Sequence, residues 1–104
     1  MARFDVYPNP SVAERKHTPF LLDVQNDFID SLTTRVVVPL RRASSFGPRP
    51  SELNPLLTIG RHSVVLDTAV LGAVPVSELR KVVAKITTER TEVRNALDAL
   101  FGGY

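Results

Sequence analysis

The sequence predicts an α+β protein in which an antiparallel sheet is followed by one C-terminal helix. In several short runs, most clearly residues 20–24 and 36–38, strand-forming apolar residues gather between stretches of turn residues. Near the end of the chain the apolar spacing changes to that of an amphipathic helix. The apolar positions of this helix are Val93, Ala96, Leu97, Leu100 and Phe101.

Length and composition favour one folded unit. The chain has 104 residues, of which 43% are hydrophobic and 23% charged, and we expect a single domain over residues 1–104. The absence of cysteine excludes disulfides and thiolate chemistry, and no stretch has the pattern of a signal peptide or a membrane span. We therefore expect a cytoplasmic protein. The net charge of +2 is scattered, so direct binding of nucleic acid is not expected.

Three strands are expected in the first part of the chain. The first lies within residues 3–7 and has one buried face, because apolar and polar side chains alternate there. A polar, basic loop covers residues 9–19. The next two strands are residues 20–24 and 36–38, and Pro39 is expected to close the third strand.

The middle of the chain predicts an irregular connection and a hairpin. Residues 41–50 contain two prolines, a glycine and three arginines, and are expected to form the longest loop. Residues 56–59 and 64–66 are predicted as a hairpin, since Gly60-Arg61 suits a type II′ turn that needs a positive φ at its first central position. A strand or strand edge is expected within residues 68–76.

The last part of the chain ends in a helix. Residues 77–87 fit a helix or a strand, and periodicity does not decide between them. The terminal helix is expected over residues 89–101, with Thr87 or Thr88 as its N-cap. Gly102-Gly103 is expected to end it.

Patterns for catalysis or metal binding are weak. Asp23, Asp27 and Asp30 suit turn formation better than cation binding, and Asp23 is placed on the polar side of its strand. His17 and His62 have no second ligand at metal-binding spacing, and we expect both on exposed loops. No nucleophile elbow and no glycine-rich phosphate loop is present. We expect neither a metal nor a cofactor, and we favour a protein that is not an enzyme.

Several short strings, taken together, resemble the CcdB family of toxins. Within residues 20–40 they are Asp23-Val24-Gln25, the pair Asp27 and Asp30, then Arg35, and Val38-Pro39-Leu40. Further strings in the family's order are Phe4-Asp5-Val6-Tyr7, Leu53-Asn54-Pro55, Ala73-Val74-Pro75-Val76 and Asn95-Ala96-Leu97. The resemblance covers nearly the whole chain.

The resemblance implies both a fold and a function. The fold is a partly open, SH3-like barrel of the CcdB/MazF type with the C-terminal helix packed on it, and with a helical turn and a short strand after Pro75. The function is that of a toxin of a type II toxin–antitoxin module. Such toxins act as homodimers, bind the gyrase A subunits of DNA gyrase and trap the cleaved DNA complex. A CcdA-like antitoxin with a disordered acidic segment neutralises them.

The gyrase-facing positions of the family are matched here by Asn26, Phe28, Asn95, Asp98, Phe101, Gly102, Gly103 and Tyr104. The family's gyrase poisons end in tryptophan, glycine and isoleucine, so Gly102 stands in the place of the tryptophan. Because aromatic side chains dominate interface energetics, this departure predicts a loss of more than about 2 kcal/mol in affinity for the target. For Phe101, a position in the hydrophobic core and a role in binding gyrase are equally compatible with the sequence.

An acidic antitoxin segment is expected to contact basic residues of the two loops at residues 9–18 and 41–49. These basic residues are Arg15, Lys16, Arg41, Arg42 and Arg49. A homodimer is also expected, since residues 36–38 and the apolar end of the helix offer more apolar surface than one small sheet covers.

Two alternative functions remain open at this point. The first is a binding module that dimerises and holds the antitoxin without poisoning gyrase. The second is a MazF-like endoribonuclease, for which Arg35, Arg41, Arg42 and His62 are conceivable parts. The chain lacks the Arg-Gly-Asp-Ile-like start of those ribonucleases, which argues against the second alternative.

Overall fold

A computed structural model describes residues 1–29 and 31–103. Within these residues it shows seven strands and one α-helix. The strands are β1 (Asp5–Pro8), β2 (Phe20–Asp23), β3 (Thr34–Arg42), β4 (Leu56–Ile59), β5 (His62–Leu66), β6 (Gly72–Pro75) and β7 (Ala84–Lys85). The helix α1 spans Arg90–Phe101. Two residues with predicted roles lie outside the described residues. They are Asp30, expected in an acidic turn, and Tyr104, expected in the gyrase-binding tail.

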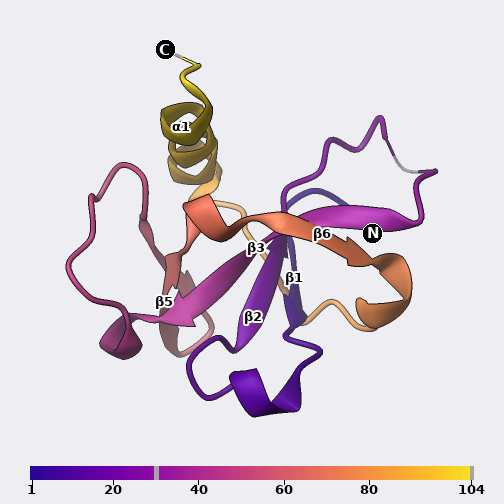
Figure 1. The fold of residues 1–104 in the computed structure, drawn as a ribbon, viewed down its shortest axis with the longest axis horizontal. Coiled ribbons are helices and arrows are strands. Elements are labelled where there is room, and N and C mark those ends of the chain that lie inside the picture. Colours follow the sequence, from indigo (N-terminus) through magenta and orange to yellow (C-terminus); the bar gives the residue numbers. More distant parts are fainter. Residues whose placement is uncertain (30, 104) are drawn as a thin grey trace.

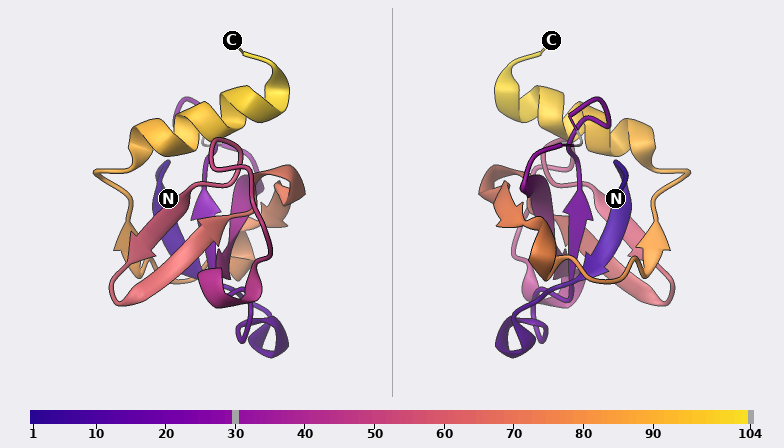
Figure 2. Two further views of the ribbon diagram at one scale, coloured as in Figure 1. Left: turned by 90° about the vertical axis from the view of Figure 1, so that its left-hand side faces the viewer. Right: turned by 90° about the vertical axis from the view of Figure 1, so that its right-hand side faces the viewer.

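The strands form one antiparallel sheet that curls into a nearly closed barrel (Figure 1). Their order is β4-β5-β3-β2-β1-β7, and β6 pairs with β3 outside this path. The helix lies across one end of the barrel (Figure 2). The predicted α+β class and SH3-like barrel are therefore confirmed.

Strand β3 is the centre of the sheet and runs through Pro39, which was expected to end it. The carbonyl oxygen of Pro39 accepts a hydrogen bond from the backbone nitrogen of Asp67 (3.0 Å), so the proline nitrogen faces the same side of the strand. On that side β6 pairs with residues 34–37 and β5 with residues 40–42. Pro39 falls between the two partners, where no ladder bond requires its missing N–H.

The main hydrophobic core fills the barrel. Its buried members are Phe4, Val6, Leu22, Val24, Val38, Leu40, Leu57, Ile59, Val64, Leu66, Ile86, Val93 and Ala96. A second, smaller cluster consists of Tyr7, Leu21, Val37 and Leu79. Strand β1 is therefore buried on both faces, not on one as predicted, because Leu79 and its neighbours cover the outer face where Tyr7 lies.

The predicted hairpin is confirmed. Ile59 of β4 pairs with His62 of β5, which leaves Gly60 and Arg61 as a two-residue turn. Gly60 has φ +58°, and Arg61 has no positive φ. A type II′ turn has a positive φ at its first central residue only, whereas a type I′ turn has one at both, so this turn is of type II′. His62 thus lies on a strand, not on the loop expected for it.

The segment after β5 shows short turns and short strands. A 3₁₀ turn at Thr68–Val70 precedes β6, so the strand expected within residues 68–76 is shorter than that range. A second 3₁₀ turn at Val76–Glu78 precedes β7. The helical turn and short strand that the family resemblance implied after Pro75 are both present.

Helix α1 begins after Glu89, so neither Thr87 nor Thr88 is its N-cap. The carboxylate of Glu89 accepts a hydrogen bond from the backbone nitrogen of Thr58 on β4 (3.0 Å) and so ties the start of the helix to the edge of the sheet. At the other end Gly102 adopts φ +72°, and the nitrogen of Gly103 donates to the carbonyl oxygen of Asp98 (2.9 Å). This is the glycine stop that the sequence predicted.

Candidate functional site

A buried ion pair supports the connection between β2 and β3. Arg35 donates from Nε to Asp23 Oδ2 (2.7 Å) and from Nη2 to Asp23 Oδ1 (2.9 Å). The side chains are 2% and 0% exposed, so Asp23 is not on a solvent-facing polar side as predicted. The hydrogen bond to Asp23 raises the pKa of Arg35 further above its ordinary value. Arg35 is therefore not available for an RNA-binding groove.

The Asp23-Val24-Gln25 string holds this connection in place. Asp23 Oδ1 also accepts a hydrogen bond from the backbone nitrogen of Gln25 (3.0 Å). The Gln25 side chain accepts from the nitrogen of Val36 on β3 (3.0 Å) and donates to the carbonyl oxygen of Ile29. Both polar side chains of this string therefore have hydrogen-bond partners, and these contacts fix the start of the loop that follows.

Asn26 and Phe28 lie on that loop. The Asn26 side chain accepts a hydrogen bond from the backbone nitrogen of Phe28 (2.9 Å), a local turn that asparagine commonly forms. Phe28 is 94% exposed. It is not part of the core, and its ring is available to a partner.

The end of α1 presents the second group of predicted gyrase-facing residues. Asn95 and Asp98 are exposed, and Phe101 is 69% exposed. The core placement considered for Phe101 is therefore wrong, because the helix turns its Val93 and Ala96 face toward the barrel.

The two groups share one end of the barrel, but Phe101 does not line the hollow beside the first group. The β2–β3 loop and α1 both stand at that end (Figure 1). Asn26 and Phe28, however, line a hollow of about 320 Å³ together with Arg90 and Arg94, from the N-terminal half of the helix. Phe101 lies seven residues beyond Arg94, a distance of roughly 10 Å along a helix.

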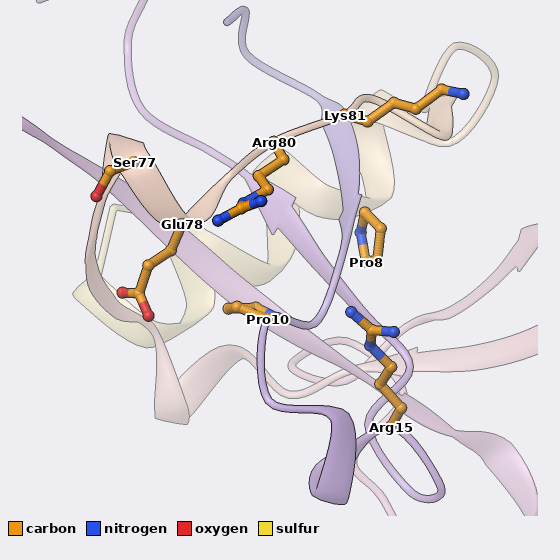
Figure 3. Close-up of a pocket in the computed structure, with 7 residues that line it drawn as sticks. All are labelled: Pro8, Pro10, Arg15, Ser77, Glu78, Arg80 and Lys81. Atoms are coloured by element: carbon orange, nitrogen blue, oxygen red, sulfur yellow. The ribbon is translucent and has the colours of Figure 1, made fainter.

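Among the predicted antitoxin-binding residues, Arg15 lines a surface pocket with a volume of about 490 Å³. Its Nε donates to the carbonyl oxygen of Asn9 (2.6 Å). Arg15 and Arg80 enter the pocket from opposite sides, whereas Lys81 extends away from it (Figure 3). Sequence reasoning missed Arg80 and Lys81, because only the fold brings residues 80–81 next to the first loop.

The other predicted antitoxin-binding residues do not form a single loop patch. Arg41 and Arg42 belong to β3, where consecutive side chains point to opposite faces. Arg41 pairs with Asp67 (3.4 Å), while Arg42 donates to the carbonyl oxygen of Lys16 (2.8 Å).

Arg42 also donates to Nδ1 of His62 (3.2 Å), which places Arg42, Lys16 and His62 on one surface. Arg49 alone lies in the long loop, and it donates to the carbonyl oxygen of Asn54 (2.8 Å).

The described residues contain no group of three or more His, Cys, Asp or Glu side chains arranged to hold a metal ion. Asp27 instead accepts a hydrogen bond from the backbone nitrogen of Arg3 (2.7 Å), and His17 Nδ1 lies 2.8 Å from Ser45 Oγ. No helix in the described part of the chain has the length and apolar character needed to cross a membrane.

A small, nearly closed antiparallel barrel with a helix across one end is the architecture of the CcdB/MazF-like barrel proteins. The chain belongs to the CcdB family, whose family model, described as CcdB protein, matches residues 3–103. The protein is therefore a toxin of a toxin–antitoxin system.

Proposed function

We propose that this toxin poisons DNA gyrase by binding the gyrase A subunits and trapping the cleaved gyrase–DNA complex, without being an enzyme itself. The supporting observation is the exposure of Phe28 (94%) and Phe101 (69%) at the barrel end that carries α1. Exposed phenylalanines at the positions that face gyrase in the family are suited to be hot spots of an interface. The proposed place of action is the cytoplasm, where gyrase and DNA are found.

Purified gyrase provides the direct test. Supercoiling and DNA-cleavage assays should show accumulation of cleaved DNA with the parent protein, and less with Phe28→Ala or after deletion of residues 102–104. Val12→Ala is a matched control, because Val12 is 72% exposed but lies in a 3₁₀ turn at the other end of the molecule (Figure 1). Parent protein that leaves gyrase untouched and cleaves RNA would replace this proposal with the ribonuclease alternative.

The tail offers a test for a gain of activity. Gly102→Trp combined with Tyr104→Ile restores the residues of the family's gyrase poisons and is expected to strengthen trapping. Gly102 has φ +72°, so a tryptophan there costs about 1 kcal/mol of stability at the helix end. Trapping that rises despite this cost would show that the tail touches gyrase. If the parent already traps fully, the tail does not limit poisoning.

We propose that the protein acts as a homodimer and that the end of α1 lies in the dimer interface. The apolar run at residues 36–38 does not supply this interface as expected, because Val37 and Val38 are 3% and 0% exposed. Near the end of α1 the apolar surface for this contact is formed by half-buried Leu100 and by exposed Val70, which lies in a turn that packs against α1.

Sedimentation tests the dimer. Leu100→Asp should dissociate it, because a carboxylate would be buried without a partner. Val12→Asp introduces the same charge at the other end of the molecule and should leave the dimer intact. Parent protein that sediments as a monomer at micromolar concentration would refute the proposal.

The acidic antitoxin segment is proposed to bind the basic surface around Arg15 and Lys16 and, on β3 and the following loop, Arg41, Arg42 and Arg49. Calorimetry with a CcdA-like acidic antitoxin segment should show an affinity that falls with salt. It should fall further in Arg15→Ala/Lys16→Ala and in the triple alanine variant of the other three arginines. A triple variant that binds as tightly as the parent would restrict the site to the first loop.

A further inference from the structure

Three arginines surround the ring of Phe4. The guanidinium carbons of Arg3, Arg90 and Arg94 lie 5.1, 5.2 and 5.6 Å from the ring centre. With Lys85 they line the hollow of about 320 Å³ that also contains Asn26 and Phe28. These cations come from the N-terminal segment, β7 and the start of α1, so only the fold brings them together.

The positive charge of this cluster is only partly neutralised within the described residues. Asp5 pairs with Lys85. Asp27 accepts a hydrogen bond from the backbone nitrogen of Arg3, not from its guanidinium. Arg94 has neither an ion pair nor a hydrogen bond to a side chain in this part of the chain. The Nε of Arg3 is buried and also lacks a hydrogen-bond partner there.

The arrangement is not one that helix stability favours. Arg90 occupies the first position of α1, next to the positive end of the helix dipole. Arg94 follows one turn later, and like charges at this spacing repel each other. Glu92 is in the same first turn, but it lines a different hollow with Asn95. An anion bound between the arginines would relieve this repulsion.

The backbone of Phe4 is strained as well. Phe4 has φ +75° and is the only described non-glycine residue with a positive φ. Its nitrogen donates to the carbonyl oxygen of Asp23 (2.7 Å), and its carbonyl oxygen accepts from the nitrogen of Ile86 (2.9 Å). Strain of this kind persists where the surrounding structure enforces it, and it is concentrated at functional sites. Here it holds the ring beneath the guanidinium groups.

We propose that this hollow binds a carboxylate side chain of an acidic peptide segment, with an apolar neighbour of that side chain resting on Phe28. Guanidinium groups bind carboxylates through charge-assisted, often bidentate hydrogen bonds. The exposed ring of Phe28 beside the cations suits a segment that alternates acidic and apolar residues. The site does not overlap the proposed antitoxin-binding residues, but it shares Asn26 and Phe28 with the proposed gyrase-binding surface.

A nucleic-acid backbone fits the hollow less well. Its phosphates form a continuous row of charge and are usually met by a long basic stripe. Here the cations are confined to one hollow, Asp5 and Asp27 lie beside them, and the net charge of the chain is only +2. A single carboxylate avoids most of the repulsion from these two acidic groups.

The test uses the blocked peptide acetyl-Glu-Phe-Glu-Leu-Glu-amide and its counterpart with glutamine at each glutamate. Amide NMR shifts should move at residues 2–4 and 90–94 with the acidic peptide only. Arg94→Glu should weaken binding at least about ten-fold, because it removes one charge-assisted contact and adds a carboxylate that repels the peptide. Arg61→Glu makes the same change of charge on an exposed turn and should bind as the parent does.

Several results would overturn the proposal. One is equal binding of the glutamine peptide, and another is shifts confined to other parts of the molecule. A third is an oligonucleotide that binds here in place of the peptide. Thermal unfolding gives a second readout, since Arg94→Glu should raise Tm at low salt by pairing with Arg90. A variant with lower Tm and unchanged peptide binding would show that the arginines merely support Phe4.

Discussion

Asp23 and Arg35 form a bidentate ion pair that is closed off from solvent and joins β2 to β3 at the base of the loop carrying Phe28. The pair therefore holds the two ends of the loop on which Phe28, part of the proposed gyrase-binding surface, is exposed. A loop whose exposed aromatic side chain must meet a partner benefits from a rigid base, because less ordering is then required on binding.

Arg35→Met should be strongly destabilising. It leaves the Asp23 carboxylate buried without its partner, and breaking a buried pair in this way costs about 3–5 kcal/mol of unfolding free energy. Urea denaturation measures this loss. Arg41→Met is the control, because Arg41 is 39% exposed and its pair with Asp67 should contribute less than about 1 kcal/mol. Equal losses in the two variants would contradict the importance given to the buried pair.

Tyr7 should make stability fall at high pH. Burial, and secondarily the Asp5 and Asp23 carboxylates, raise the pKa of Tyr7 from 10.0 to about 12. Below pH 10 the hydroxyl is protonated in both the folded and the unfolded protein. Between about pH 10 and 12 only the unfolded chain releases the proton, so the unfolding free energy decreases, by up to about 3 kcal/mol.

Urea denaturation at pH 9 and pH 11 tests this, with Tyr7→Phe as the comparison. Both proteins should carry Tyr104→Phe, so that Tyr7 is the one tyrosine present in the reference. The Tyr7→Phe variant should lose this part of the pH dependence. At neutral pH it should be at least as stable as its reference, because the Tyr7 hydroxyl is buried without a hydrogen-bond partner among the described residues. Identical pH slopes would refute the assignment.

Glu89 should matter more for stability than Glu92, although both are acidic residues at the start of α1. Glu89→Ala removes the bond to the nitrogen of Thr58 on β4 and should cost about 1–2 kcal/mol. Glu92→Ala removes only a favourable interaction with the helix dipole and should cost about 0.5 kcal/mol. Thermal or urea unfolding compares the two variants, and a larger loss for Glu92→Ala would contradict the tie between helix and sheet.

Phe28 and Phe101 should separate stability from function. Truncation of either exposed ring to alanine should change the unfolding free energy by less than about 0.5 kcal/mol, while gyrase trapping declines. Phe4→Ala is the contrasting variant, since Phe4 is 3% exposed and its loss should cost about 3–5 kcal/mol. If Phe28→Ala unfolds as readily as Phe4→Ala, the ring is part of the fold and not free for a partner.

The sequence by itself determined the features that depend on neighbouring residues. The apolar spacing of α1, the two-residue turn at Gly60-Arg61 and the helix stop at Gly102 are local, because each depends on side-chain period or on the φ that glycine permits. The resemblance to the CcdB family also predicted the barrel, and the helical turn and short strand after Pro75.

Tertiary structure decided the features that depend on residues far apart in the chain. Pro39 stays within β3 because two different strands meet beside it, and Asp23 can be buried because the Arg35 side chain binds its carboxylate. The same holds for the site. The exposure of Phe28 and the gathering of cations around Phe4 follow from how the loop, β7 and α1 meet at one end of the barrel. Burial and charge clustering are properties of the packed molecule, and a local pattern of residues does not contain them.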